Sequence, residues 1–398
     1  MVTTHAFFLW NLRHAVARGD PDFTVYYTAG RMLREGRGSQ LYDPRTQLAV
    51  QREFAADADT RHSPLPYIHP PFEALIFLPL TFLPYPAAYV LWNALNLGIL
   101  LGASRLLRAS VECLRLISAG DLYLALLAFF PVFANFHQGQ DAILLLLVVL
   151  LAFSAWEQGA DFSAGLWIGV GLFKYHLILP LAVVLVLWRG RKFLLGLLTT
   201  ASAAILISLA IVGWHGALEY PGFTWRVLSQ PLLGRIPFRQ LPNLLGLIAG
   251  WSSEEYSGRL LPAAVLVGSI LLLALAARLG SFAVNRSLAR MAFAFALTSA
   301  LFVGYSTNTY DLALLVLPIA LAVDHLLRES TEPYAQRIAL ILPILPLLLS
   351  SLWFYLWLRW EHINVIAIFI LWWLCAIGKE ILRMRVRAGA PTTVSTLA

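Results

Sequence analysis

The sequence predicts an all-α protein that crosses a membrane many times. Of its residues 59% are hydrophobic, only 13% are charged, and the mean hydropathy is +0.71. Apolar runs of the length that a helix needs to cross a bilayer recur along the 398 residues. A soluble domain could not bury that much apolar surface, so the class is a polytopic membrane protein.

Four regions follow one another within a single membrane domain. We expect residues 1–71 to form a loop with short helices, 72–213 the N-terminal transmembrane helices, 214–258 a second loop, and 259–398 the C-terminal transmembrane helices and a tail. About eleven spans are expected, several of them short enough to be tilted, broken or buried in the bundle. They run roughly over 85–104, 121–134, 140–157, 162–173, 175–188, 193–213, 259–278, 290–305, 311–327, 337–358 and 363–382.

The distribution of basic residues predicts the orientation. Fifteen of the 29 Lys and Arg fall in short segments on one side of the membrane, whereas the short loops opposite hold only Lys174 and Arg359. By the positive-inside rule, the basic side is cytoplasmic and the two long loops are extracytoplasmic, as expected for a multi-pass plasma membrane protein. Because the basic residues lie in short loops rather than on one soluble face, the net charge of +7 does not indicate nucleic-acid binding.

The first polar stretch carries the main catalytic candidate. Asp20-Pro21-Asp22-Phe23-Thr24-Val25-Tyr26-Tyr27 sets two carboxylates against aromatic residues at the expected outer edge of the membrane. Such surroundings can tune a carboxylate into a general base, and Asp22 is the candidate. The alternative is a turn or a helix cap, for which Asp-Pro-Asp is well suited.

Further polar residues lie in short outer turns between apolar spans. They include His137 and Gln140 within 135–141, Lys174, the pair Tyr310 and Asp311, and Glu361-His362. Ionisable groups at membrane depth are costly, so those that occur there mark functional sites by default. Because all these turns face the same compartment as Asp22, they predict one extracytoplasmic site.

Each of these residues also has a structural interpretation. Lys174 can extend toward lipid headgroups instead of binding a phosphate, and His137 and Gln140 can satisfy backbone groups of a tight turn. Asp311 can cap the helix that it opens, and Tyr310 can belong to the aromatic belt at the membrane interface. No HExxH or CxxC spacing and no Gly-rich phosphate loop is present, so the sequence indicates neither a metal nor a nucleotide, and no cofactor is expected.

Several short motifs together resemble glycosyltransferase family 87. They are Asp22-Phe23-x-x-Tyr26-Tyr27, Leu41-Tyr42-Asp43-Pro44, Tyr67-x-His69-Pro70-Pro71-Phe72, Gly139-Gln140, and Gly165-x-x-x-Gly169 leading to Lys174 and Pro180. The resemblance covers residues 20–200, and Tyr310-Asp311 at the head of a late helix fits as well. Each motif is loose, and their order and spacing carry the match.

The resemblance implies a GT-C-type bundle and an activity. Such an enzyme transfers a sugar, typically mannose, with inversion from a polyprenyl-phosphate carrier to a hydroxyl of a lipid or glycan acceptor, on the extracytoplasmic side and without metal. It implies Asp22 as the base, Lys174 as a phosphate contact and Gln140 as a ligand contact. The other candidates for substrate binding are His137, Tyr27, His69, Tyr310 and Asp311.

Two departures from the family pattern stand out. The span that usually precedes the Asp-containing loop is missing or reduced to residues 5–17, as in an N-terminally truncated gene. Where some members carry histidines in a late outer loop, this chain has Tyr310-Asp311, so Asp311 is the candidate to assist the base.

Two other classes of function compete with the transferase. A lipid or glycolipid transporter would also use broken helices and polar groups within the membrane. It should, however, carry polar residues at matching depth in both halves, whereas those of this chain gather on one side. A structural membrane subunit without chemistry is the third possibility, and it would tolerate Asp22→Asn in every assay.

Overall fold

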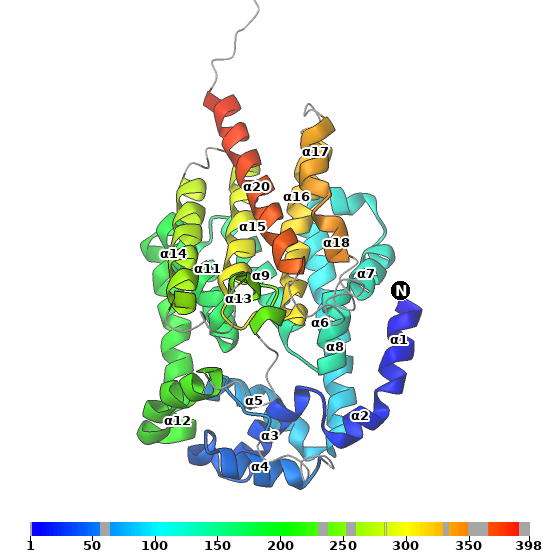
Figure 1. Cartoon of the computed structure of the whole chain (residues 1–398), viewed down its shortest axis with the longest axis vertical. Helices are drawn as coiled ribbons and strands as arrows, with labels where there is room; N and C mark the ends of the chain where they lie inside the picture. Colours follow the sequence, from blue (N-terminus) through cyan, green and yellow to red (C-terminus); the bar gives the residue numbers. More distant parts are fainter. Residues whose placement is uncertain are drawn as a thin grey trace, which may run out of the picture.

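The computed structural model describes residues 2–55, 64–229, 238–251, 260–281, 283, 285–328, 334–348 and 365–389. Within these ranges every regular element is a helix, which confirms the all-α class. Most helices run along the long axis of the molecule, and α3 (Phe23–Arg34), α4 (Pro44–Arg52) and α5 (Ala74–Phe77) lie together across one end (Figure 1). We call this the α3 end, and the other the opposite end.

The N-terminal helices form their own small core at the α3 end. The Asp43 carboxylate caps α4 by accepting from the backbone N–H groups of Arg45 and Thr46, and Pro44 occupies the first helical position. Aromatic side chains then hold the helices together, since the ring of Tyr26 stacks on that of Phe77 with centroids 4.4 Å apart. The preceding α1 (Val2–Asn11) and α2 (Arg13–Arg18) run beside the bundle (Figure 1).

The bundle itself is made of longer helices around an apolar core. The strongly buried α15 and α16 lie inside it, while α12 and α14 expose most of their apolar side chains, as helices in contact with lipid do. Its helices are α6 (Tyr85–Ser110), α7 (Ala119–Ala128), α8 (Phe130–Gln138), α9 (Ala142–Glu157), α10 (Asp161–Val170), α11 (Tyr175–Arg189), α12 (Arg191–Ser229), α13 (Leu244–Trp251), α14 (Leu260–Ser281), α15 (Arg286–Val303), α16 (Val316–Arg328), α17 (Tyr334–Ile341), α18 (Ile344–Leu348) and α20 (Val365–Gly389).

Helices α10 and α11 form a hairpin within the bundle. The Arg189 Nε atom lies 3.3 Å from Asp161 Oδ1, so the start of α10 and the end of α11 meet. A straight helix of the same length would hold these residues about 40 Å apart. The chain therefore reverses at the 3-10 turn η6 (Gly171–Lys174), and the two short segments expected over 162–173 and 175–188 are separate helices with Lys174 at their turn.

Close packing of this hairpin explains the glycine spacing in the sequence. A Cβ atom at Gly165 would overlap the carbonyl oxygen of Phe193 in α12, and one at Gly169 would lie 2.7 Å from Thr200 Cβ. Glycine at these two positions lets the backbones of α10 and α12 approach, as the spacing predicts.

By length and apolar composition, the described residues contain seven helices that can cross a membrane, or eight if the bent pair α7 and α8 forms one span. This confirms a polytopic membrane protein. The number differs from the expected eleven because Asp161–Arg189 counts once although it folds back, and because α9 is shorter than the seven. The expected span over 337–358 lies partly outside the described residues, and Glu361-His362 lies wholly outside them.

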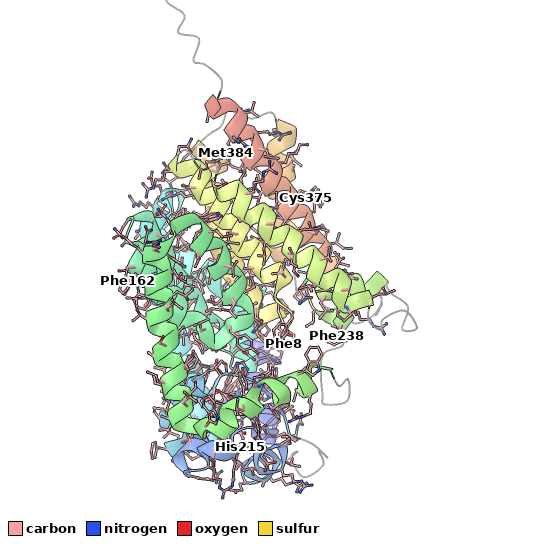
Figure 2. All side chains as sticks on the ribbon, turned by 90° about the vertical axis from the view of Figure 1, so that its left-hand side faces the viewer. Phe8, Phe162, His215, Phe238, Cys375 and Met384 are labelled. Carbon is pink, nitrogen blue, oxygen red and sulfur yellow. The ribbon has the colours of Figure 1, made fainter. Side chains whose placement is uncertain are left out.

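The region expected as a loop over 214–258 is helical over much of its described length. Helix α12 continues beyond residue 213 to Ser229, and α13 follows a short gap. Gly213 adopts a left-handed φ of 69° with a ψ of 178°, and at this kink α12 turns from the bundle axis across the α3 end, where His215 lies (Figure 2). The chain thus covers the side of the α3 end with helix rather than with an open loop.

Candidate active site

A polar cavity of about 200 Å³ lies where the N-terminal helices meet the bundle. Phe238, one of its wall residues, lies between His215 and Met384 of α20 along the long axis of the molecule (Figure 2). Its ionisable and polar walls come from segments far apart in the sequence, namely Asp22, Tyr26, His69, Gln140, Lys174, Tyr175, His176, Tyr305, Ser306, Asn308, Tyr310 and Asp311. Six of the eight sequence-predicted site residues line this cavity, namely Asp22, His69, Gln140, Lys174, Tyr310 and Asp311.

Asp22 occupies the N-cap position of α3, but its side chain makes no cap hydrogen bond. Its Oδ2 atom accepts a hydrogen bond from Gln140 Nε2 at 2.7 Å, and its backbone N–H donates to Gln138 Oε1 at 3.1 Å. The side chain therefore does not act as the cap that the Asp-Pro-Asp sequence suggested. It lies in the cavity wall, where Gln140 binds the carboxylate and Gln138, from the same turn, binds the backbone of Asp22.

The turn that carries these glutamines fits closely against α3. Gly139 has a left-handed φ of 62°, and a Cβ atom there would lie 2.7 Å from Phe23 Cβ. From α6, Trp92 Nε1 donates to the Gly139 carbonyl at 3.0 Å and fixes the turn from behind. Glycine thus allows Gln138 and Gln140 to reach Asp22 from one short segment.

Burial sets the protonation behaviour of two groups that line the site. It raises the pKa of Asp22, and the hydrogen bond from Gln140 and the charge of Lys174 act in the opposite direction. Burial also lowers the pKa of His69 to about 4, so its imidazole is neutral at neutral pH. His69 Nδ1 lies 3.0 Å from Oε2 of the buried Glu73. Asp22, a carboxyl with a raised pKa, and His69, a neutral imidazole, line the same cavity. Such a pair of groups is suited to proton transfer.

Lys174 is buried in the site, with only 2% of its side chain exposed. Its Nζ atom is 3.0 Å from Asp141 Oδ1, 3.0 Å from Asp311 Oδ1 and 3.2 Å from Gln140 Oε1. The same atom lies 5.0 Å from the centre of the Tyr310 ring. An ammonium enclosed in this way does not extend to lipid headgroups, so the structural interpretation of Lys174 from the sequence does not apply.

Asp311 combines the two roles that the sequence left open. Its Oδ2 atom accepts from the backbone N–H of Asn308 at 2.8 Å and completes a capping box at the start of η9 (Thr309–Leu315). Its Oδ1 atom holds Lys174. Tyr310, the preceding residue, turns its hydroxyl toward the Asp22 carboxyl. Capping thus orients Asp311 for the ion pair.

Two of the predicted residues do not line the cavity. The Tyr27 hydroxyl donates to the Leu83 carbonyl at 2.8 Å, and its ring packs edge-on against Phe54 with centroids 4.8 Å apart. The ring of His137 lies against Phe133 with centroids 5.9 Å apart. Tyr26 takes the place expected for Tyr27, because Asp22 and Tyr26 are four residues apart on one face of a helix.

Four residues of the site were not among the candidates from the sequence. Tyr26 donates to Gln140 Oε1 at 2.6 Å, Asp141 pairs with Lys174, Glu73 pairs with His69, and His176 lines the cavity wall. Helical spacing from Asp22 would have indicated Tyr26. An acidic residue beside long apolar segments would have indicated Asp141 and Glu73.

Asp20 and Asp22 have a spacing that can hold a divalent cation, but their side chains diverge. The Asp20 carboxylate is 37% exposed and pairs with Arg18 at 2.9 Å, whereas Asp22 faces the cavity. Among the described residues no three His, Cys, Asp or Glu side chains are arranged to hold a metal ion. Asp57 and Asp59, with the same spacing, lie outside the described part of the chain.

Comparison with known proteins identifies the family. The family model of glycosyltransferase family 87 matches residues 67–318, which is more than half of the chain and holds every cavity residue named above except Asp22 and Tyr26. The matched range starts later than the resemblance read from the sequence and extends well beyond its end. No curated protein and no solved structure matches the chain. The chain is a membrane protein of glycosyltransferase family 87.

Proposed function

We propose that this membrane glycosyltransferase moves a hexose, with mannose as the first candidate, from a polyprenyl-phosphate carrier to a hydroxyl of a lipid or glycan acceptor. In this proposal Asp22 is the base, the reaction inverts the anomeric carbon, and it takes place on the extracytoplasmic side of the plasma membrane. The observation that carries the proposal is the placement of Asp22, whose carboxyl lies in the cavity wall instead of capping α3.

A single displacement accounts for what the site offers. The acceptor hydroxyl gives its proton to the Asp22 carboxylate while its oxygen forms a bond to the anomeric carbon. The bond from that carbon to the phosphate oxygen breaks on the opposite face, and the polyprenyl phosphate leaves with the electron pair. Gln140 occupies one lone pair of Asp22 Oδ2, and a carboxylate has about four such sites, so room remains for the acceptor.

An apolar cavity beside the polar one supports a lipid-linked donor. It has a volume of about 330 Å³, and Tyr175 lines both cavities. Its other walls are almost entirely apolar, with Pro70, Pro71 and Phe72 on one side and α12 residues such as Ala204 and Ile205 on the other. A sugar phosphate in the polar cavity can therefore continue into a hydrocarbon chain without leaving the protein surface.

The chemistry of the acidic groups supports a reaction without metal. Asp141 and Asp311 each direct an oxygen to Lys174, and the second oxygen of Asp311 caps a helix. One oxygen of Asp141 and both oxygens of Asp311 are thus already engaged by groups of the chain itself. We expect transfer to continue in the presence of a chelator.

The charges at the opposite end support the proposed orientation. Arg189, Arg286, Arg290 and Arg328 all lie there, paired with acidic side chains such as Glu157 and Asp324. By the positive-inside rule this end faces the cytoplasm, and the cavity then faces outward.

The test compares Asp22→Asn with a neighbouring control. Purified protein is incubated with radiolabelled polyprenyl-phosphate-mannose and a membrane lipid extract, and label in the acceptor fraction is measured. Asp22→Asn should lower transfer by at least about 100-fold, the lower range of what a general base contributes. Asp20→Asn removes an exposed carboxylate two residues away and should leave transfer unchanged.

The outcomes separate the alternatives. Transfer by the wild type that survives in Asp22→Asn would remove Asp22 as the base. If the label stays on the carrier with wild-type protein, the assay is repeated with polyprenyl-phosphate-glucose and polyprenyl-phosphate-arabinose as donors. If none of the three is used, the polyprenyl-phosphate donor is wrong, and flipping of labelled lipid in vesicles then tests the transporter.

A further inference from the structure

The ammonium of Lys174 has carboxylate partners on two sides. Asp141 and Asp311 are almost fully buried, and each places an oxygen 3.0 Å from Lys174 Nζ. Two carboxylates and one ammonium leave a net negative charge at this point. A phosphate that approached Lys174 would add negative charge to a site that already has an excess, which is unfavourable in a poorly hydrated interior.

Lys174 nevertheless has a third contact that leads toward Asp22. The side-chain oxygen of Gln140 accepts hydrogen bonds from Lys174 Nζ at 3.2 Å and from the Tyr26 hydroxyl at 2.6 Å. An ammonium has donors and no acceptor, so it accepts only one orientation of the neighbouring amide. The amide oxygen must face Lys174, and the amide NH₂ must then face Asp22, where it donates at 2.7 Å.

The reverse orientation of Gln140 would be unfavourable on both sides. It would place an NH₂ group against the ammonium and a carbonyl oxygen against the Asp22 carboxylate. Both contacts are repulsive, and both groups are largely shielded from water. Lys174 therefore determines, through its hydrogen bond to Gln140, that the amide NH₂ group and not the amide oxygen faces Asp22.

We propose that Lys174 is a positioning residue that acts through the Gln140 amide to hold the Asp22 carboxylate in the cavity wall, and that it is not a contact for the donor phosphate. Asp141 and Asp311 hold Lys174 in turn, so Asp141, Asp311, Lys174 and Gln140, which come from three segments, form one continuous network that ends at Asp22. This inference rests on the proposed role of Asp22 as base. It replaces the phosphate contact that the family resemblance implies for Lys174.

The experiment is a double-mutant cycle in a background that keeps the buried charges balanced. Removing Lys174 alone leaves two buried carboxylates without a cation, which threatens folding. In an Asp311→Asn background, the side-chain oxygen can still cap η9, and removal of Lys174 then leaves Asp141 as the one partner that loses its cation. The four proteins compared carry Asp311→Asn alone, or with Lys174→Met, Gln140→Leu, or both.

We expect Lys174→Met to lower kcat by about 10- to 100-fold, the scale of a misplaced catalytic group, while the donor KM changes by less than about 3-fold. In the Gln140→Leu background, Lys174→Met should add less than about 3-fold, because the residue through which it acts is gone. The acid limb of the pH profile should move to higher pH in both single changes, since Asp22 loses a hydrogen-bond donor.

A neutral hydrogen-bond donor at position 174 separates donation from charge. Lys174→Gln can still donate to the Gln140 oxygen but has no charge for a phosphate, so it should retain more activity than Lys174→Met. Lys192→Met removes an exposed lysine at the start of α12 and serves as the control without effect.

The proposal would be overturned if Lys174→Met raised the donor KM and the inhibition constant of polyprenyl phosphate by at least about 10-fold, and if this rise persisted in the Gln140→Leu background. That result would restore the phosphate contact. Equal activity of Lys174→Met and the background protein would also overturn it. Failure of the proposed function is recognised separately, as full activity of Asp22→Asn.

Discussion

The two ends of the bundle both contain buried charges, but the charges are arranged differently. At the opposite end, Arg290 pairs with both Glu157 and Asp324, Arg328 also pairs with Asp324, and His325 pairs with Glu380. Positive and negative groups there are matched. At the α3 end, acidic side chains outnumber the single ammonium among the described cavity residues, and burial raises the pKa of Asp22. We call the matched network of Arg290, Glu157, Asp324 and Arg328 the clamp, because it holds helices together. An excess of negative groups beside a cavity instead indicates a functional site.

The clamp joins elements that the sequence separates widely. Arg290 in α15 contacts Glu157 in α9 and Asp324 in α16, and it donates to the Ser110 carbonyl at the end of α6 at 2.9 Å. Asp324 also accepts from the backbone N–H of Cys113 at 2.8 Å. No substrate is needed to explain any of these groups, because each has a partner in the chain.

The largest expected effect comes from breaking this clamp. Arg290→Leu leaves Glu157 and Asp324 buried without their common cation, a change that typically costs about 3–5 kcal/mol of stability. We expect a clear drop in the apparent Tm of the purified protein, measured in detergent. Transfer per folded molecule should not change, because the clamp lies at the far end from Asp22.

The comparison would fail in either of two ways. An unchanged Tm would show that the matched network contributes nothing to stability. A loss of transfer by protein that remains folded would show that the opposite end takes part in the reaction.

The second prediction tests the turn that carries the two glutamines. Gly139→Ala forces a residue with a side chain into the left-handed region and places its Cβ atom 2.7 Å from Phe23 Cβ. We expect transfer to fall by about 10- to 100-fold, since Gln138 and Gln140 move relative to Asp22. The measurement is kcat per folded molecule.

A second glycine provides a matched control for backbone strain. Gly159 has a similar φ of 72°, but a Cβ atom there meets nothing within 4 Å. Both substitutions carry the left-handed cost of about 1–2 kcal/mol, and Gly139→Ala adds the overlap with Phe23, so Gly139→Ala should destabilise more than the control. Equal loss of transfer in both variants would show that general destabilisation, and not the position of the turn, explains the effect of Gly139→Ala.

The sequence predicted the clamp and the site to very different degrees. Apolar periodicity and length were sufficient for the all-α membrane class and for the hairpin with Lys174 at its turn, because these features depend on local composition. The Gly165 and Gly169 spacing is likewise a local feature, and it fits the close approach of α10 and α12. Arg290 was read only as one basic residue of a cytoplasmic loop, since its partners lie more than thirty positions away in sequence.

The sequence predicted most residues of the site but not the contacts between them. Asp22 and Gln140 are 118 positions apart, and Lys174 and Asp311 are 137 apart, so no local pattern shows that they touch. The sequence consequently assigned Lys174 and Gln140 directly to the ligand. The contacts show that Lys174 and Asp311 mainly face other protein groups, which is a tertiary property.

The smallest expected effects compare two carboxylates at the α3 end whose pKa values move in opposite directions. For Asp22, burial raises the pKa in the folded protein, so folding takes up a proton and stability declines as the pH rises from the ordinary pKa to the raised one. Asp22→Asn removes this cost. The variant should therefore be inactive and yet have a higher apparent Tm than the wild type at neutral pH, and the difference should vanish in acid.

Asp43 should show the reverse. Burial acts to raise its pKa, but hydrogen bonds from the Thr46 side chain and from the backbone N–H groups of Arg45 and Thr46 outweigh burial and lower it. Its contribution to stability is thus present above the ordinary pKa and is lost as the pH falls through the lowered one. Asp43→Asn should lower the Tm slightly at neutral pH, with the difference again vanishing in acid. Opposite signs for the two variants would mark Asp22 as the carboxylate kept at the expense of stability, as expected for a catalytic group. If both lower the Tm, Asp22 stabilises the fold and the contrast between a clamp and a site no longer holds.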